Sequence, residues 1–141
     1  MPYTPLELAA AFIKTGELDD ALDALNQHLA ATPSDDEARR MRIETLLRMP
    51  ENYQLALTDC DALSTPTADD CLKRSILCEK LNNLDSALQS MDTALQLQPG
   101  TERLIERQLY LLQLKGDFAA ALKLLDVVPS TWRWKQWAGD L

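Results

Sequence analysis

The sequence predicts an all-α protein in which about four pairs of helices stack side by side as an α-solenoid. One phrase, a turn residue followed by an apolar residue and then Ala-Leu, occurs four times in the 141 residues. Its alanines are 35, 31 and 34 residues apart, and self-similarity at such a period is typical of repeat architectures. Prolines close the first three units. The alanines are Ala21, Ala56, Ala87 and Ala121, and the prolines are Pro33, Pro66 and Pro99.

Each phrase predicts a helix, a tight turn and a second helix. Gly16, Asn82 and Gly116 precede the apolar residue, where they break a helix, and Asp85 and Asp117 favour the start of the next one. We expect first helices at about 4–14, 36–48, 68–81 and 102–115. We expect second helices at about 18–31, 53–64, 84–97 and 117–127. A proline after each of the first three second helices fits a helix end.

This pattern resembles the tetratricopeptide repeat family over about residues 3–129. The third unit, residues 81–88 followed by Met91, Ala94 and Pro99, is the most similar. The first helices lack the family's tryptophan, and Pro50 with an extra turn residue leaves the register of the second unit's first helix open by a residue or two. The resemblance implies a single domain over residues 1–141, a right-handed solenoid with repeats at about 3–35, 36–66, 67–100 and 101–129.

Residues 130–141 depart from the repeat pattern and contain all three tryptophans of the chain, Trp132, Trp134 and Trp137. Ser130 or Thr131 suits the N-cap of a short final helix. One interpretation is a C-terminal capping helix whose indoles cover the apolar face that the last repeat leaves exposed. The other is a contact with a binding partner or with a second copy of the chain.

Charge is distributed unevenly between the two kinds of helix. The formal net charge is −8, and the second helices with their turns contain ten acids against one base, Lys123. By resemblance, first helices line the concave side of the solenoid, so we expect a more basic inner surface and an acidic outer one. The alternative is that the first-helix bases form i,i+4 pairs or are simply solvated. These bases are Arg39, Arg40, Arg42, Arg48, Lys73, Arg74, Lys80, Arg103 and Arg107.

The resemblance also predicts which residues line a partner-binding groove. Carried over position by position, they are Leu6, Ala10, Ile13, Lys14, Met41, Arg48, Leu72, Ile76, Lys80, Arg103, Arg107 and Tyr110, with Thr45 as a further candidate. This groove suits a peptide with apolar anchors and some acidic residues. Leu6 and Ala10 replace the lysine and asparagine with which some family members hold chaperone tails, so such a tail is not the expected partner.

The sequence predicts no catalytic residue, cofactor or metal. His28 is the only histidine, and Cys60, Cys71 and Cys78 are an odd number without a CxxC pair, so we expect buried thiols that act as small apolar side chains. No glycine-rich phosphate loop is present. The negative charge disfavours nucleic acid, and the apolar stretches are too short to span a membrane. The first residues do not resemble a signal peptide, so a cytoplasmic location is the default expectation.

Together these observations predict a protein-interaction adaptor or scaffold that binds a peptide or protein segment in the concave groove, and not an enzyme. The alternative is a structural homo-oligomer, in the simplest case a homodimer, that assembles through the Trp-rich C-terminal segment or an open end of the solenoid.

Overall fold

The computed structural model describes residues 3–129, and this part of the chain folds into four antiparallel helix pairs without any strand. Apart from the helices, one short 3-10 turn, η1 (Pro50–Asn52), precedes α4. The all-α solenoid prediction is confirmed, and each expected helix boundary lies within two residues of the observed one. The pairs are α1 (Pro5–Thr15) with α2 (Leu18–Ala31), α3 (Asp36–Leu47) with α4 (Tyr53–Ala62), α5 (Ala68–Lys80) with α6 (Leu84–Leu97), and α7 (Glu102–Lys115) with α8 (Phe118–Asp126).

The turn within each repeat has the backbone geometry that its residues favour. Gly16 and Gly116 adopt φ values of 82° and 84° at the ends of α1 and α7, a left-handed conformation that glycine adopts without strain. Asn82 takes the same role after α5, with φ 62°. The second repeat uses η1 instead, which accommodates the extra residue near Pro50.

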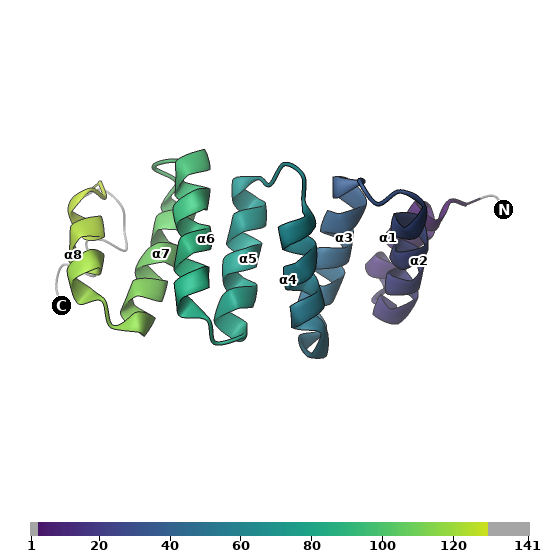
Figure 1. Ribbon diagram of the computed structural model, residues 1–141, viewed down its shortest axis with the longest axis horizontal. Helices are drawn as coiled ribbons and strands as arrows, with labels where there is room; N and C mark the ends of the chain where they lie inside the picture. The colour runs from purple at the N-terminus through teal and green to yellow at the C-terminus, as the bar shows by residue number, and fades with distance from the viewer. Residues whose placement is uncertain (1–2, 130–141) are drawn as a thin grey trace.

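The helix pairs follow one another along a row, in which the turns within repeats lie at one edge and the connections between repeats lie at the opposite edge (Figure 1). Consequently all first helices run in one direction and all second helices run in the other. Among the described residues no helix is both long and apolar enough to cross a membrane.

The repeated alanines lie at the helix crossings. Ala21, Ala56 and Ala87 are fully buried, and Ala121 is 5% exposed. Helix axes approach to roughly 8–10 Å only where small side chains occupy the crossing, so the period of the alanines is the period of close packing.

The core runs continuously from repeat to repeat. Leu77 of α5 packs with Ile43 and Leu46 of α3, and Leu104 and Leu111 of α7 pack with residues of α5 and α6. Each repeat therefore buries its apolar side against the next one, as expected of a solenoid. The three free cysteines are buried in these clusters, which confirms the prediction that they act as small apolar side chains. They are Cys60, Cys71 and Cys78.

Candidate functional site

An open pocket lies between α1 and α3 and reaches Lys73 on α5. It has a volume of about 330 Å³ and is lined by three apolar and four charged residues: Ala10, Ile13, Met41, Glu37, Arg40, Glu44 and Lys73. Ala10 is exposed, and Met41 is half-buried against the core of the first repeat. The structure thus brings together three of the predicted groove residues as an apolar patch with charged surroundings.

Cross-helix ion pairs hold the bases of this pocket in place. Lys73 of α5 pairs with Glu44 of α3 and with Asp69 of α5. The guanidinium of Arg40 donates to Glu37 at 2.6 Å and to the buried Asp70 of α5 at 3.0 Å. Arg40 and Lys73 are only 23% and 21% exposed, so their charge is largely neutralised before any partner binds.

A second set of predicted groove residues meets where α5 packs beside α7. Arg107 donates to Glu79 and, at 3.3 Å, to the Ser75 hydroxyl. The Tyr110 hydroxyl donates to Glu79 at 3.0 Å, and this bond raises the pKa of Tyr110. Arg103 pairs with Asp69 at 3.3 Å. Arg103, Arg107 and Tyr110 therefore form a joint between two repeats, with their positive charge balanced by α5.

Three other predicted cations are exposed and are not held by ion pairs within the described chain. Lys14, Arg48 and Lys80 are exposed and lie at the C-terminal ends of α1, α3 and α5. Within residues 3–129 none of them forms an ion pair; Lys80 Nζ lies 5.9 Å from the centre of the Tyr53 ring. Because the first helices are parallel, the three cations follow one edge of the solenoid, which we call the basic edge. Cations at helix C-termini are also favoured by the helix dipole.

The remaining predicted groove residues contribute mainly to packing. Leu6 and Leu72 are half-buried against the cores of the first and third repeats, and Ile76 is also half-buried. The expectation for Thr45 is wrong: it is fully buried and donates to the Met41 carbonyl at 2.8 Å. Glu44, one residue earlier, faces the pocket instead. The sequence did not specify which residues of α3 face the pocket, because the extra residue of this repeat lies after the helix, where η1 accommodates it.

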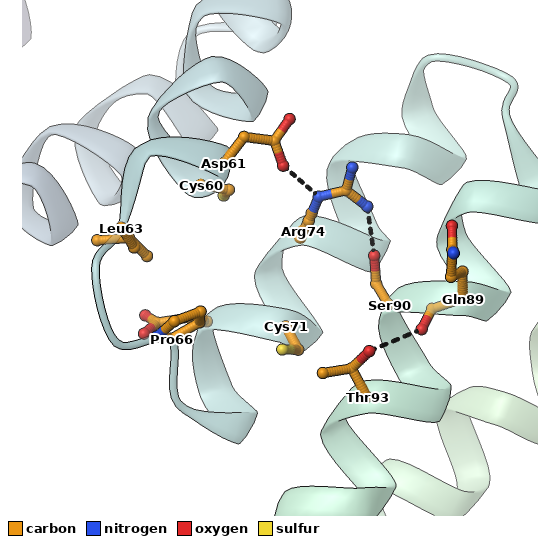
Figure 2. A pocket seen from close by; sticks show the side chains of 10 residues that line it. Cys60, Asp61, Leu63, Pro66, Cys71, Arg74, Gln89, Ser90 and Thr93 are labelled. Atoms are coloured by element: carbon orange, nitrogen blue, oxygen red, sulfur yellow. Dashed lines mark hydrogen bonds and ion pairs between the residues drawn. The ribbon is translucent and has the colours of Figure 1, made fainter.

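The first-helix bases do not all face the same side, which corrects the expectation of one basic surface. Figure 2 shows Arg74 of α5 between two second helices, donating to Asp61 of α4 and to Ser90 of α6, both at 2.7 Å. Arg42 of α3 likewise bonds to Asp59 of α4 and Asn26 of α2. Both arginines therefore tie second helices together. One pocket lies beside Arg74 and a second lies beside Arg42, at the corresponding place one repeat earlier. Because the pocket recurs in successive repeats, we interpret it as a feature of repeat packing.

Cys60 and Cys71 line the pocket beside Arg74, and their thiols are unsuited to nucleophilic chemistry. Burial raises the pKa of Cys60 to about 12 and also raises the pKa of Cys71. A thiol that stays protonated near neutral pH is a poor nucleophile and a poor metal ligand. Among residues 3–129 no group of three or more potential metal-ligating side chains comes together.

His28 joins two neighbouring repeats. Its Nε2 lies 2.8 Å from an Asp35 carboxylate oxygen, which joins the end of α2 to the N-cap of α3. This bond is the main reason that the pKa of Asp35 is lowered.

The predicted capping or contact residues Trp132, Trp134 and Trp137 lie outside the described residues. The described chain ends beyond α8, at Pro129, and α8 presents Phe118 and Leu122 with 65% and 64% of their surface exposed.

Comparison with known proteins finds similarity at the level of structure. No model of a known protein family and no curated protein matches the sequence. Among solved structures, MamA AMB-1 superposes with a TM-score of 0.79 at 22% identity, covering 86% of this chain and 68% of that one. MamA MSR-1 gives 0.75 at 22% identity over 85% and 70%. MamA from Desulfovibrio magneticus RS-1, residues 41 to the end, gives 0.76 at 19% identity over 86% and 72%. These likenesses show that the chain has the helical solenoid fold of MamA.

Proposed function

We propose that this chain is a tetratricopeptide-type adaptor that binds a segment of another protein along its first helices and catalyses no reaction. An apolar side chain of the segment enters the pocket between α1 and α3, and acidic side chains of the segment lie along the basic edge. The partner is a protein in the same compartment, for which the cytoplasm is our expectation, and neither nucleic acid nor a cofactor takes part.

The observation that carries this proposal is the pocket itself. Ala10, Ile13 and Met41 offer an apolar floor in an open pocket of about 330 Å³, which lies at the small end of the size range of ligand pockets and can accept one or two side chains. An open apolar site of this kind suits a side-chain anchor of a peptide.

The distribution of free charge supports an acidic segment. Lys14, Arg48 and Lys80 have no carboxylate partner within the described chain, whereas Arg103 and Arg107 already pair with α5. Neighbouring first helices in a solenoid are spaced by roughly 10 Å, which three residues of an extended peptide span. Carboxylates at that spacing on the partner would meet successive cations of the basic edge.

The pocket is tested with a matched pair of variants on one helix. Ala10 and Ala11 are adjacent, both are exposed, and only Ala10 lines the pocket. Peptides selected from a displayed random library on the wild-type protein serve as probes, and their affinity is measured by fluorescence anisotropy. We expect Ala10→Glu to weaken binding more than tenfold and Ala11→Glu to leave it nearly unchanged. Equal effects of the two changes, or a library that yields no binder, would contradict the proposal.

The basic edge is tested with three lysines that are all exposed. Lys14→Glu and Lys80→Glu should each weaken the binding of acidic selected peptides, while Lys123→Glu on α8 should change it little. Because exposed charges are screened by salt, wild-type affinity should fall as ionic strength rises, and both edge variants should show a shallower dependence. Salt-independent binding would remove the electrostatic part of the proposal and leave the apolar anchor.

A homo-oligomer is the competing function, and the exposed Phe118 and Leu122 at the end of the solenoid favour it. Light scattering over a range of concentrations distinguishes the two: an adaptor stays monomeric, whereas an assembly grows with concentration. Truncation after Pro129 then shows whether residues 130–141 take part.

A further inference from the structure

The same hydrogen-bonded contact recurs on the outer side of the solenoid, between each of the first three second helices and the first helix that follows it. Five residues after the repeated alanine, the second helix carries a polar side chain, and a long side chain of the next first helix donates to it. We call these three contacts the outer joints. Their pairs are Arg42 with Asn26 at 3.0 Å, Arg74 with Asp61 at 2.7 Å, and Gln108 with Asp92 at 2.9 Å.

In the first two outer joints an arginine also reaches the second helix beyond it. Arg42 donates two hydrogen bonds to the buried Asp59 of α4, and Arg74 donates to Ser90 of α6 at 2.7 Å (Figure 2). Asp59 and Ser90 both lie three residues after a repeated alanine. The planar guanidinium has five donors, so it fills the space between two second helices and satisfies polar groups on both sides.

The third outer joint has glutamine in the place of this arginine. Among the described residues Gln108 donates to Asp92 alone, and the position three residues after Ala121 is occupied by the apolar Leu124. The Oε1 atom of Gln108 is buried and accepts no hydrogen bond within residues 3–129. Buried polar atoms normally have a hydrogen-bond partner. The third joint therefore lacks the donor groups that the first two obtain from arginine.

The space next to Gln108 is correspondingly open. The pocket at the third joint has a volume of about 480 Å³, whereas the pocket beside Arg42 has about 280 Å³. Its apolar walls come from three helices, with one leucine from each: Leu88 of α6, Leu112 of α7 and Leu124 of α8. Asp92 lines the same pocket, and its exposed carboxylate can accept further hydrogen bonds besides the one from Gln108.

We propose that the third outer joint binds an arginine side chain of another protein, in the place that Arg42 and Arg74 occupy in the first two joints. The guanidinium donates to Asp92 and, after rotation of the Gln108 amide, to its Oε1 atom. The aliphatic part of the arginine packs against the three leucines, as long basic side chains do on apolar surface.

The charge around the third joint favours a basic partner segment. The second helices with their turns contain ten acids against one base, Lys123. Lys123 also lines this pocket and opposes the binding of a cation there, so it limits the affinity. Complementary charge would guide a basic segment to this side of the solenoid. The site is separate from the pocket between α1 and α3, so the chain binds an acidic and a basic segment at the same time.

NMR titration of the isotope-labelled full chain with N-acetyl-arginine methylamide tests the proposal. The backbone amides of Asp92, Lys123 and Leu124 should shift and saturate. N-acetyl-citrulline methylamide has nearly the same shape without the charge and should bind at least tenfold more weakly. Ala10→Glu, in the pocket between α1 and α3, should leave the arginine titration unchanged, so this test is independent of the function proposed above.

Four variants locate the binding site. Asp92→Asn should weaken arginine binding at least fivefold. Asp23→Asn is the matched control, since it makes the same change at another exposed acid of a second helix, and it should alter the affinity less than twofold. Gln108→Arg should place an arginine of the chain itself in the third joint and abolish binding. Lys123→Ala should tighten binding.

Several results would overturn the proposal. Equal losses in Asp92→Asn and Asp23→Asn would mean that the ligand responds only to the general negative charge. Citrulline binding as tight as arginine binding, or undiminished binding by a Gln108→Arg chain that circular dichroism shows to be folded, would exclude the guanidinium site. Shifts of the pocket amides on dilution of the protein alone would assign the pocket to a second copy. Binding that appears only after truncation following Pro129 would assign it to the chain's own end.

Discussion

Replacing Ala87 by leucine is the most direct test of the helix crossings. Ala87 is fully buried in α6, in a cluster that also contains Cys78 of α5, Met91 of α6 and Leu111 of α7. A leucine there has to displace side chains on three helices at once. Overpacking of a tight core costs about 1–3 kcal/mol. At roughly 2–4 °C per kcal/mol for a chain of this size, the melting temperature should fall by about 2–12 °C.

Ala119→Leu is the control, since it makes the same chemical change at an exposed position of α8. Surface substitutions of this kind change stability by about 0.5 kcal/mol or less. Both variants are compared with the wild type by thermal unfolding followed by circular dichroism, with urea unfolding to give the free energy. If Ala87→Leu melts with the wild type, or if Ala119→Leu falls as far as Ala87→Leu, the assignment of the repeated alanines to close helix crossings is wrong.

Three further predictions concern buried charge, thiols and pH. Asp59 is buried and accepts two hydrogen bonds from Arg42, so Asp59→Ala should lower the free energy of unfolding by about 2–3 kcal/mol in a urea titration. This loss is smaller than that for a fully buried pair because Arg42 is 22% exposed. Asp126→Ala, at an exposed position, should have little effect in the same titration. The cysteines should not react with Ellman's reagent in the native state, because they are buried and the pKa of Cys60 is raised to about 12. They should react once urea unfolds the chain, and rapid labelling of the native protein would refute this. The pKa of Asp35 is lowered in the folded state, chiefly by the bond to His28. The carboxylate should therefore stabilise the fold above pH 3.8, and this contribution should be lost as pH falls through the pKa of the folded state. The fall in melting temperature on acidification should accordingly be smaller in Asp35→Ala than in the wild type.

Much of the fold could be predicted because its signals are local. Gly16 and Gly116 mark turns, Pro33 and Pro99 follow helix ends, and the repeated alanines mark crossings. Each of these effects acts within a few residues of the chain, so the period appears directly in the sequence. The helix boundaries follow from the same short-range rules, and for this reason they agree with the structure to within two residues.

The candidate site was only partly predictable. Ala10, Ile13 and Met41 were expected in the groove from their repeat positions and do line one pocket. The pocket's charged residues Glu37 and Glu44 were not among the predicted groove residues, since the extra residue accommodated by η1 left the register of α3 undetermined. Shifting the expected groove positions of α3 by one residue would have replaced Thr45 by Glu44, which lines the pocket.

What the sequence by itself determined is therefore the number, order and extent of the helices and the small residues at which they cross. Only the tertiary structure decided how the bases of the first helices are used. Arg107 meets Glu79 28 residues away, Arg103 meets Asp69 34 residues away, and Arg74 turns toward the second helices instead. Such pairs depend on the distance and rotation between stacked repeats, which are set by packing over the whole core and are not encoded at any one position.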